Sequence, residues 1–357
     1  MTDVKPDLEG VVAFETTIAE PDREGGALRY RGVDIEDLVG VKHYENTWGL
    51  LVDDSFEPGM PAADPYRLAN PTGNAPADLQ AATARLGAEW KLGQLIDIDD
   101  DRARDDLARL SATMISVVAQ SARGAAAPVS GSVVDAGETA AEQFLLRWRG
   151  EADPRHARAI DAYWVSAAEH GLNASTFTAR IVASTGADCA AAMSAAVGAL
   201  SGPLHGGAPT RVLKMLDEAA AVDDMGAYVR GLLDRGERLM GFGHRVYRAE
   251  DPRARVLRRT SRELGSPRFE AAEELERVAL AELHARKPDR VLATNVEFWS
   301  AVVLDIAEIP SDLFPALFAC ARVAGWSAHI LEQKRTGRLI RPSALYVGPA
   351  SRPLASV

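Results

Sequence analysis

The chain has 357 residues, of which 47% are hydrophobic and 25% are charged. These fractions are typical of a globular protein with material for one large or two modest domains. The net charge of -11 and the pI near 5.2 argue against a nucleic-acid partner, which would favour a basic face. An anionic small ligand remains compatible with this charge if arginines and histidines converge locally.

Cysteine usage and the absence of apolar runs bear on the compartment. Cys189 and Cys320 both lie in apolar, helical surroundings, so we expect buried free thiols and a cytoplasmic protein. The N-terminus has no basic region followed by an apolar one, and no run of about 18 apolar residues occurs. We therefore expect neither a signal peptide nor a membrane partner.

The N-terminal segment carries the clearest strand signal. Residues 10–18 are rich in β-branched side chains, a Pro/Gly turn follows at 21–26, and a second short apolar segment covers 27–32. This pattern predicts a β-hairpin. Asp34 is expected to cap a short helix that contains Ile35, Leu38 and Val39.

The remainder is predominantly helical, because apolar residues recur at three and four spacing. A connection rich in Pro, Asp and Asn interrupts this pattern at 61–76. The acidic run at 97–101 is interpreted as a solvated helix start and not a cation site. The small residues of 183–200 predict one helix that packs closely, inside the subunit or across a dimer interface. Further helices are expected at 104–120, 137–149, 159–169, 210–222, 225–235, 252–264, 268–286, 295–306 and 313–335, the last with Gly337 as its C-cap.

Residues suited to ligand binding and proton transfer are most concentrated at 241–253. Glycines on either side of Phe242 allow the backbone to approach a ligand closely. His244 can exchange a proton near neutral pH, and Arg248 and Arg253 suit a carboxylate or phosphate. Val246 stands where the dinucleotide fingerprint needs a third glycine, so that motif is excluded. The segment therefore predicts an anion-binding loop.

Three histidines stand beside glycine or proline and are expected to face one cleft. They are His170, His205 and His244. A metal site is the rival explanation, but their separation and the lack of a close His or Cys pair argue against it. We expect no metal.

A carboxylate and two arginines complete the candidates. Glu297 precedes Phe298 and Trp299, so desolvation would favour a proton-accepting role, whereas a surface glutamate at a helix start is the alternative. Arg322 lies on an apolar helix, where a guanidinium is costly to bury without an anionic partner. Arg341 has a similar apolar setting.

These residues give the chain a clear resemblance to the citrate synthase family over residues 10–348. The motifs HGLNAST (170–176), GPLHGGA (202–208), GFGH (241–244) with DPR (251–253), and NVE (295–297) occur in family order, followed by Arg322 and Arg341-Pro342. The resemblance implies a mainly α, two-domain fold with a small N-terminal hairpin. The large domain would comprise 1–206 and 312–357, and the small domain 207–311.

The resemblance also implies a reaction, the condensation of acetyl-CoA with oxaloacetate to give citrate and CoA. No cofactor is implied, because acetyl-CoA is a substrate, and the partner is a second copy of the chain. The implied catalytic residues are His205, which stabilises the enolate, Glu297, which removes the methyl proton, and His244, which polarises the ketone. The implied oxaloacetate ligands are His170, His244, Arg253 and Arg322, with Arg341 from the neighbouring subunit. The implied CoA ligands are Gly241, Phe242, Gly243 and Arg248.

One residue departs from the family pattern, because most members have Asp where this chain has Glu297. The extra methylene lengthens the side chain by ~1.5 Å, and a misplacement of about 1 Å can cost a hundredfold in rate. With a glutamate at this position, either the backbone is set back from the site, or the enzyme is slow, or it prefers another acyl-CoA. We expect the backbone position to compensate for the longer side chain. The alternatives to citrate synthesis are 2-methylcitrate synthesis from propionyl-CoA and a ligand-sensing relative with weak catalysis.

Overall fold

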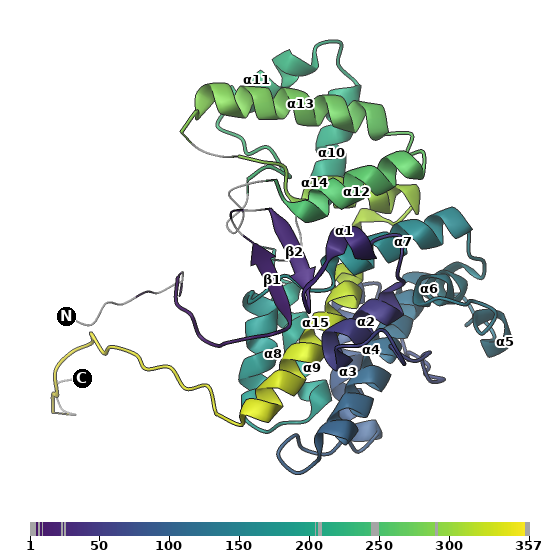
Figure 1. Cartoon of the computed structure of the whole chain (residues 1–357), viewed down its shortest axis with the longest axis vertical. Helices are drawn as coiled ribbons and strands as arrows, with labels where there is room; N and C mark the ends of the chain where they lie inside the picture. The colour runs from purple at the N-terminus through teal and green to yellow at the C-terminus, as the bar shows by residue number, and fades with distance from the viewer. Residues whose placement is uncertain are drawn as a thin grey trace.

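A computed structural model gives the arrangement of the chain (Figure 1). It describes residues 5, 8, 10–22, 24, 26–203, 205, 209–243, 250–289 and 292–353. Within these ranges the elements are mostly helices, with one three-stranded sheet near the N-terminus. The fold is therefore mainly α, as the sequence predicts.

The N-terminal sheet begins later in the chain than expected. Strands β1 (Ala19–Asp22), β2 (Ala27–Tyr30) and β3 (Val33–Asp34) pair antiparallel in that order. Residues 11–18 form no strand and Val12 is exposed, so the predicted strand at 10–18 is wrong. Strand propensity alone does not make a strand unless one face is buried. Pro21, expected in the turn, pairs with Leu28 on the edge strand, where a missing N–H is tolerated.

The larger body of the protein is built around one long helix, α15 (Phe314–Thr336). It packs against helices from both halves of the chain and is buried along most of its length (Figure 1). Of its most apolar window, 89% is buried inside the protein, so packing accounts for a helix long enough to cross a membrane. Its neighbours are α2 (Tyr44–Asp53), α3 (Ala75–Glu89), α4 (Asp100–Arg123), α7 (Pro154–Ala167), α8 (Ala174–Ser184) and α9 (Cys189–Leu200).

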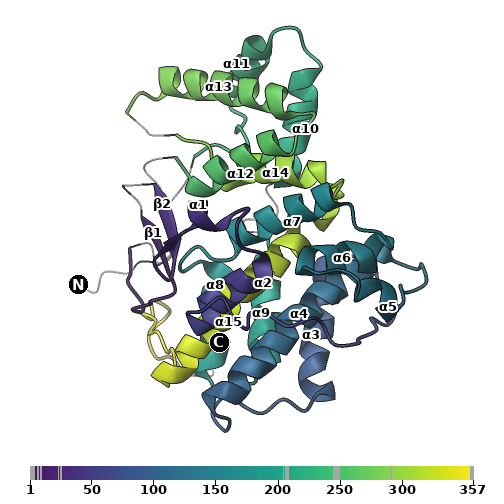
Figure 2. The same cartoon turned by 45° about the vertical axis from the view of Figure 1, so that its right-hand side comes forward.

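Another group of helices lies at one end of this body (Figures 1 and 2). Its outer members are α10 (Pro209–Ala220), α11 (Met225–Asp234) and α13 (Phe269–Arg286). Its inner members, α12 (Pro252–Glu263) and α14 (Val296–Ile306), pack on each other and on α7 of the larger body. The domain boundaries predicted at 206/207 and 311/312 remain a prediction. The remaining elements are α1 (Ile35–Leu38), α5 (Gly131–Val134), α6 (Ala140–Arg149) and η1 (Ser311–Leu313).

Capping explains most helix ends. Asp34 accepts from the N–H of Glu36, which confirms the predicted cap, and Gly337 ends α15 at φ 63°. Asp99 caps α4, which confirms that the acidic run is a helix start. The single helix predicted at 183–200 is wrong: Gly186 has φ 84° and Asp188 caps α9, so α8 and α9 are separate helices. Cys189 and Cys320 are buried free thiols, as expected.

Tyr30 joins the small sheet to the end of α7. Its buried hydroxyl lies 3.1 Å from the carbonyl oxygens of Val165 and Ser166 and 3.2 Å from that of Glu169. Its one proton can go to any one of these carbonyls near the helix C-terminus, and its oxygen accepts from the N–H of Glu169 at 3.3 Å. The sheet thereby fixes the segment that leads into His170.

Replacing Tyr30 by Phe should lower the free energy of unfolding by about 1–3 kcal/mol, because it removes a buried donor to these carbonyls and the acceptor for the N–H of Glu169. Denaturant unfolding followed by circular dichroism measures the change. The control is Tyr346→Phe, which removes an exposed hydroxyl bonded only to the carbonyl of Pro349. Equal losses in the two variants would contradict the assignment.

Candidate active site

The loop at 241–243 is joined by backbone hydrogen bonds to the segment that precedes α14. Gly243 donates to the carbonyl of Ala293 at 2.8 Å, and Asn295 donates to that of Gly241 at 2.9 Å. Gly241 and Gly243 have φ of 85° and 88°, which other residues resist. A Cβ on Gly241 would also lie 2.7 Å from the Cβ of Phe298. The glycines are therefore required by the close approach of this loop to α14.

Asn295 orients both this loop and the candidate base. Its side-chain oxygen accepts from the N–H of Glu297 at 3.0 Å and caps α14, while its amide nitrogen donates to the carbonyl of Gly243 at 2.9 Å. Glu297 lies in the first turn of the helix and is only partly exposed. Burial raises the pKa of its carboxyl, and the nearby charges of Arg253 and Arg238 partly oppose this rise.

Asp251 holds Arg253 and was missed by sequence reasoning. Its carboxylate accepts from Nε and Nη2 of Arg253 at 3.0 and 2.8 Å, and both residues are buried. It also caps α12 and accepts from the N–H of Val296 at 3.0 Å. One carboxylate thus fixes the guanidinium and joins the starts of α12 and α14. The Asp-Pro-Arg order was a usable signal, because Pro at the first helical position favours an Asp cap before it.

Arg322 is buried inside the apolar core, with 2% of its surface exposed. Its Nε donates to the carbonyl of Ala167 at 2.7 Å, and its guanidinium lies over the ring of Phe318. Its Nη1 is buried without a hydrogen-bond partner within the described part of the chain. Burial lowers its pKa, and the carboxylate of Glu169 acts in the opposite direction. The position leaves a donor available for an anionic ligand.

His205 is held by Ser175, which sequence reasoning also missed. Its Nε2 lies 2.9 Å from Ser175 Oγ, which also receives the indole N–H of Trp326 at 3.2 Å. Burial lowers the pKa of His205 to about 4, and the charge of Arg322 adds to this effect. His205 is therefore a neutral imidazole at physiological pH. Ser175 belongs to the HGLNAST motif and is the second residue of α8, but only the structure shows which histidine it contacts.

His170 follows the end of α7 that Tyr30 secures. The next residue, Gly171, has φ 63°, and a Cβ there would touch the ring of Pro21 in β1. Asn173 then caps α8 and donates to the carbonyl of Gly171 at 3.2 Å. The histidine therefore lies in a tight turn between two helices, next to the buried Glu169.

Electrostatic interactions link four of the predicted residues. Arg322 affects the pKa of His205, and Arg253 affects the pKa values of both Arg322 and Glu297. Tyr163 of α7 is influenced by Arg322, Arg253 and Glu297 together. His205, Arg322, Arg253 and Glu297, which are up to 117 positions apart in the sequence, are thus linked in series by charge. The last three lie on α15, α12 and α14, and all three of these helices pack on α7.

The structure does not place every predicted residue in this site. Arg341 is exposed on the C-terminal extension, which leaves the body of the protein (Figure 1). His244 and Arg248 fall outside the described residues, whereas Phe242 is described and packs on Phe298. Within the described part of the chain, no three His, Cys, Asp or Glu side chains are grouped so as to hold a metal. A cavity of about 140 Å³ between α2, α4 and α6 is lined by none of the described site residues.

Nearly the whole chain matches a single protein family. The sequence profile described as "Citrate synthase, C-terminal domain" matches residues 7–343. The chain belongs to the citrate synthase family. Members of this family are transferases that make citrate from acetyl-CoA and oxaloacetate.

Individual relatives cover nearly all of the chain. A Mycobacterium tuberculosis protein named "Putative citrate synthase 2" is 60% identical over 354 residues, which are 99% of this chain and 95% of that protein. Haloferax volcanii citrate synthase is 37% identical over 97% of this chain and 96% of its own length. A Thermoplasma acidophilum citrate synthase, solved with carboxymethyl coenzyme A and oxaloacetate, has a TM-score of 0.82 at 28% identity and covers 99% of both chains.

Replacing Gly241 by Ala should lower the free energy of unfolding by about 2 kcal/mol or more, because it adds an overlap with Phe298 to the strain of a positive φ. The matched control is Gly236→Ala, where φ is 74° and a Cβ would meet nothing within 4 Å. That control carries the backbone strain alone. Thermal unfolding of the two variants measures the difference, and equal losses would show that contact with Phe298 is unimportant.

Proposed function

We propose that this chain condenses acetyl-CoA with oxaloacetate and hydrolyses the resulting thioester, with the site above as its active site. The supporting observation is the convergence of a neutral imidazole, a carboxylate of raised pKa and two buried guanidinium groups. Removing a proton next to a thioester requires a base and an enolate stabiliser acting together. A dicarboxylate acceptor requires fixed cations.

His205 is proposed to stabilise the enolate as a neutral donor. Ser175 Oγ has one proton and two acceptors in reach, Asn173 Oδ1 at 2.9 Å and His205 Nε2 at 2.9 Å. Trp326 Nε1 can only donate to this oxygen. If the serine proton goes to His205 Nε2, the other ring nitrogen carries the imidazole proton and can donate to the thioester oxygen. Donation to Asn173 Oδ1 would instead put the imidazole proton on Nε2, so this role of His205 requires the serine proton to go to His205.

Glu297 is proposed to be the base that removes the methyl proton. Its raised pKa brings it nearer to the operating pH, which improves a general base, while Arg253 keeps the carboxylate charged. Arg253 and Arg322 would bind the carboxylates of oxaloacetate, together with His170. His244 would polarise the ketone, and Arg248 with residues 241–243 would receive CoA. These roles follow from the family motifs and remain proposals.

The active site is proposed to be completed in a homodimer. Arg341 lies on an exposed extension that leaves its own body, a position suited to reaching a second subunit (Figure 1). Helix α9 packs against α3 and α8 of the same chain. Packing within the subunit therefore explains at least part of its small, buried side chains without a dimer interface.

Release of free CoA tests the proposal directly. Purified protein with oxaloacetate should release CoA from acetyl-CoA, measured with a thiol reagent. The same assay with propionyl-CoA tests 2-methylcitrate synthesis, since one methylene in a pocket changes kcat/KM by roughly 10–200-fold. Absence of turnover with both donors in folded protein would favour a ligand-sensing relative.

Glu297→Gln should lower kcat by about 10²–10⁴-fold, because an amide cannot accept the methyl proton. In the wild type, the pKa rise means that Glu297 takes up a proton at a higher pH than an ordinary glutamate. The rate should therefore be full above this raised pKa and fall as pH drops through it. Glu270→Gln, which alters an exposed glutamate in the first turn of α13, is the control. Unchanged kcat in Glu297→Gln would remove the base from the proposal.

A further inference from the structure

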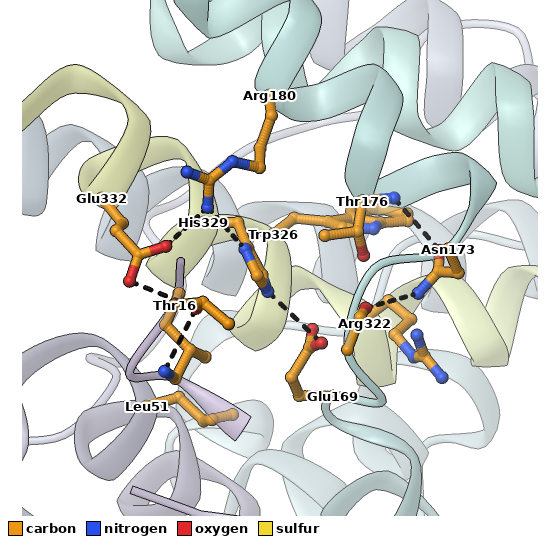
Figure 3. A network of polar contacts seen from close by, with 12 residues as sticks. Thr16, Leu51, Glu169, Asn173, Thr176, Arg180, Arg322, Trp326, His329 and Glu332 are labelled. Carbon is orange, nitrogen blue, oxygen red and sulfur yellow. Dashed lines mark hydrogen bonds and ion pairs between the residues drawn. The ribbon is translucent and has the colours of Figure 1, made fainter. Parts of the chain in front are cut away.

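A chain of buried polar groups runs through the core beside the site (Figure 3). Glu332 accepts from Arg180 Nη1 at 2.6 Å, and the same nitrogen lies 2.9 Å from His329 Nδ1. His329 Nε2 lies 3.3 Å from Glu169 Oε1. At the outer end, the hydroxyl of Thr16 donates to Glu332 Oε1 at 3.2 Å. The chain thus leads from the N-terminal segment to Glu169, the residue before His170.

Arg180 determines which ring nitrogen of His329 carries the proton. Arg180 can only donate, so His329 Nδ1 must accept and the imidazole proton must be on Nε2. This N–H faces Glu169 Oε1, although without the alignment of a full hydrogen bond. His329 therefore presents a donor to the carboxylate and limits where it can lie.

Glu169 is a fully buried carboxylate that needs a cation. It is 0% exposed, and both oxygens lack a hydrogen-bond partner among the residues that the structure describes. A Cβ on Gly325 would overlap Glu169 Oε2, so the backbone of α15 approaches it closely. The two carbonyls just before it in the chain, those of Ala167 and Ala168, accept from Arg322 Nε at 2.7 Å and from the N–H of Gly325 at 3.2 Å. Glu169 therefore lies near Arg322, and its charge acts on that guanidinium. A buried carboxylate is tolerated only when such a partner offsets its loss of hydration.

A nearby carboxylate offsets each of the two arginines, but in different ways. Arg253 forms a direct ion pair with Asp251, which is also bonded to backbone N–H groups and caps α12. Arg322 forms no ion pair among the described residues; Glu169, whose oxygens carry no hydrogen bonds there, acts on it by charge without direct contact. Without these carboxylates the guanidinium groups would repel each other in an empty site. Glu169 differs from Asp251 because its contribution is charge rather than capping.

We propose that Glu169 is the internal counter-ion of Arg322 in the empty site, and that its negative charge weakens the binding of the dicarboxylate substrate. The inference rests on the proposed role of Arg322 in binding oxaloacetate. Once a substrate carboxylate reaches Arg322, two anions share one guanidinium and repel each other. Glu169 therefore stabilises the unliganded protein and limits its affinity for oxaloacetate.

The test is Glu169→Gln, which keeps the shape and removes the charge. The melting temperature without ligand should fall, while the rise in melting temperature on adding oxaloacetate should exceed that of the wild type. KM for oxaloacetate should fall by about three- to tenfold, since a like charge near the ligand is removed. KM for acetyl-CoA should change less than about twofold, because its thioester, unlike oxaloacetate, places no carboxylate at Arg322.

Two further variants separate this role from a structural one. Glu332→Gln removes the same charge at the other end of the chain and should leave KM for oxaloacetate unchanged. Glu169→Asp keeps the charge and should retain a KM near that of the wild type. An unchanged or raised KM for oxaloacetate in Glu169→Gln would overturn the proposal, as would an equal fall in Glu332→Gln.

The remaining outcomes are also informative. If Glu169→Gln does not fold alone, oxaloacetate should restore folding and acetyl-CoA should not; failure of oxaloacetate to do so would also overturn the proposal. If oxaloacetate fails to stabilise the wild type, the substrate assignment itself is wrong. The wild-type measurement thus separates failure of the proposed function from failure of this inference.

Discussion

The burial of Arg322 in the central helix is the constraint on which the rest of the site depends. The charge of a guanidinium that is 2% exposed in an apolar core must be offset by polar or anionic groups of the fold itself. The carbonyl of Ala167 at the end of α7 accepts from its Nε, and Glu169 supplies a nearby negative charge. The turn between α7 and α8 is therefore fixed in relation to α15, and His170 lies within that turn.

The same principle organises the other half of the site. Asp251 holds Arg253, caps α12 and accepts from the start of α14, so a single carboxylate sets the relative position of a cation and of Glu297. The glycine loop is joined to that start through Asn295. Because α12 and α14 also pack on α7, these two halves meet at one helix of the larger body. Any movement of α12 and α14 relative to α7 would carry Arg253 and Glu297 with it.

Much of this fold could be predicted from sequence because helix signals are local. The three and four spacing of apolar residues, Asp34 and Asp99 as caps, and Gly337 as a terminator all act within a few residues. The strand predicted at 10–18 failed because strand formation depends on a distant partner, and β-branched residues alone do not supply one. The helix predicted at 183–200 failed because helical small residues masked the Gly186 turn and the Asp188 cap.

The sequence by itself determined the family, the helical class and the chemical types of the site, because motif order and residue type are properties of the chain. It identified Glu297, His205, Arg253 and Arg322 without their surroundings. Only the tertiary structure decided that Ser175 faces His205, that Asp251 grips Arg253 and that Glu169 offers its charge to Arg322. Those pairings join segments that core packing brings together. Burial and the strength of a charge interaction both depend on distances in space, which the local sequence does not contain.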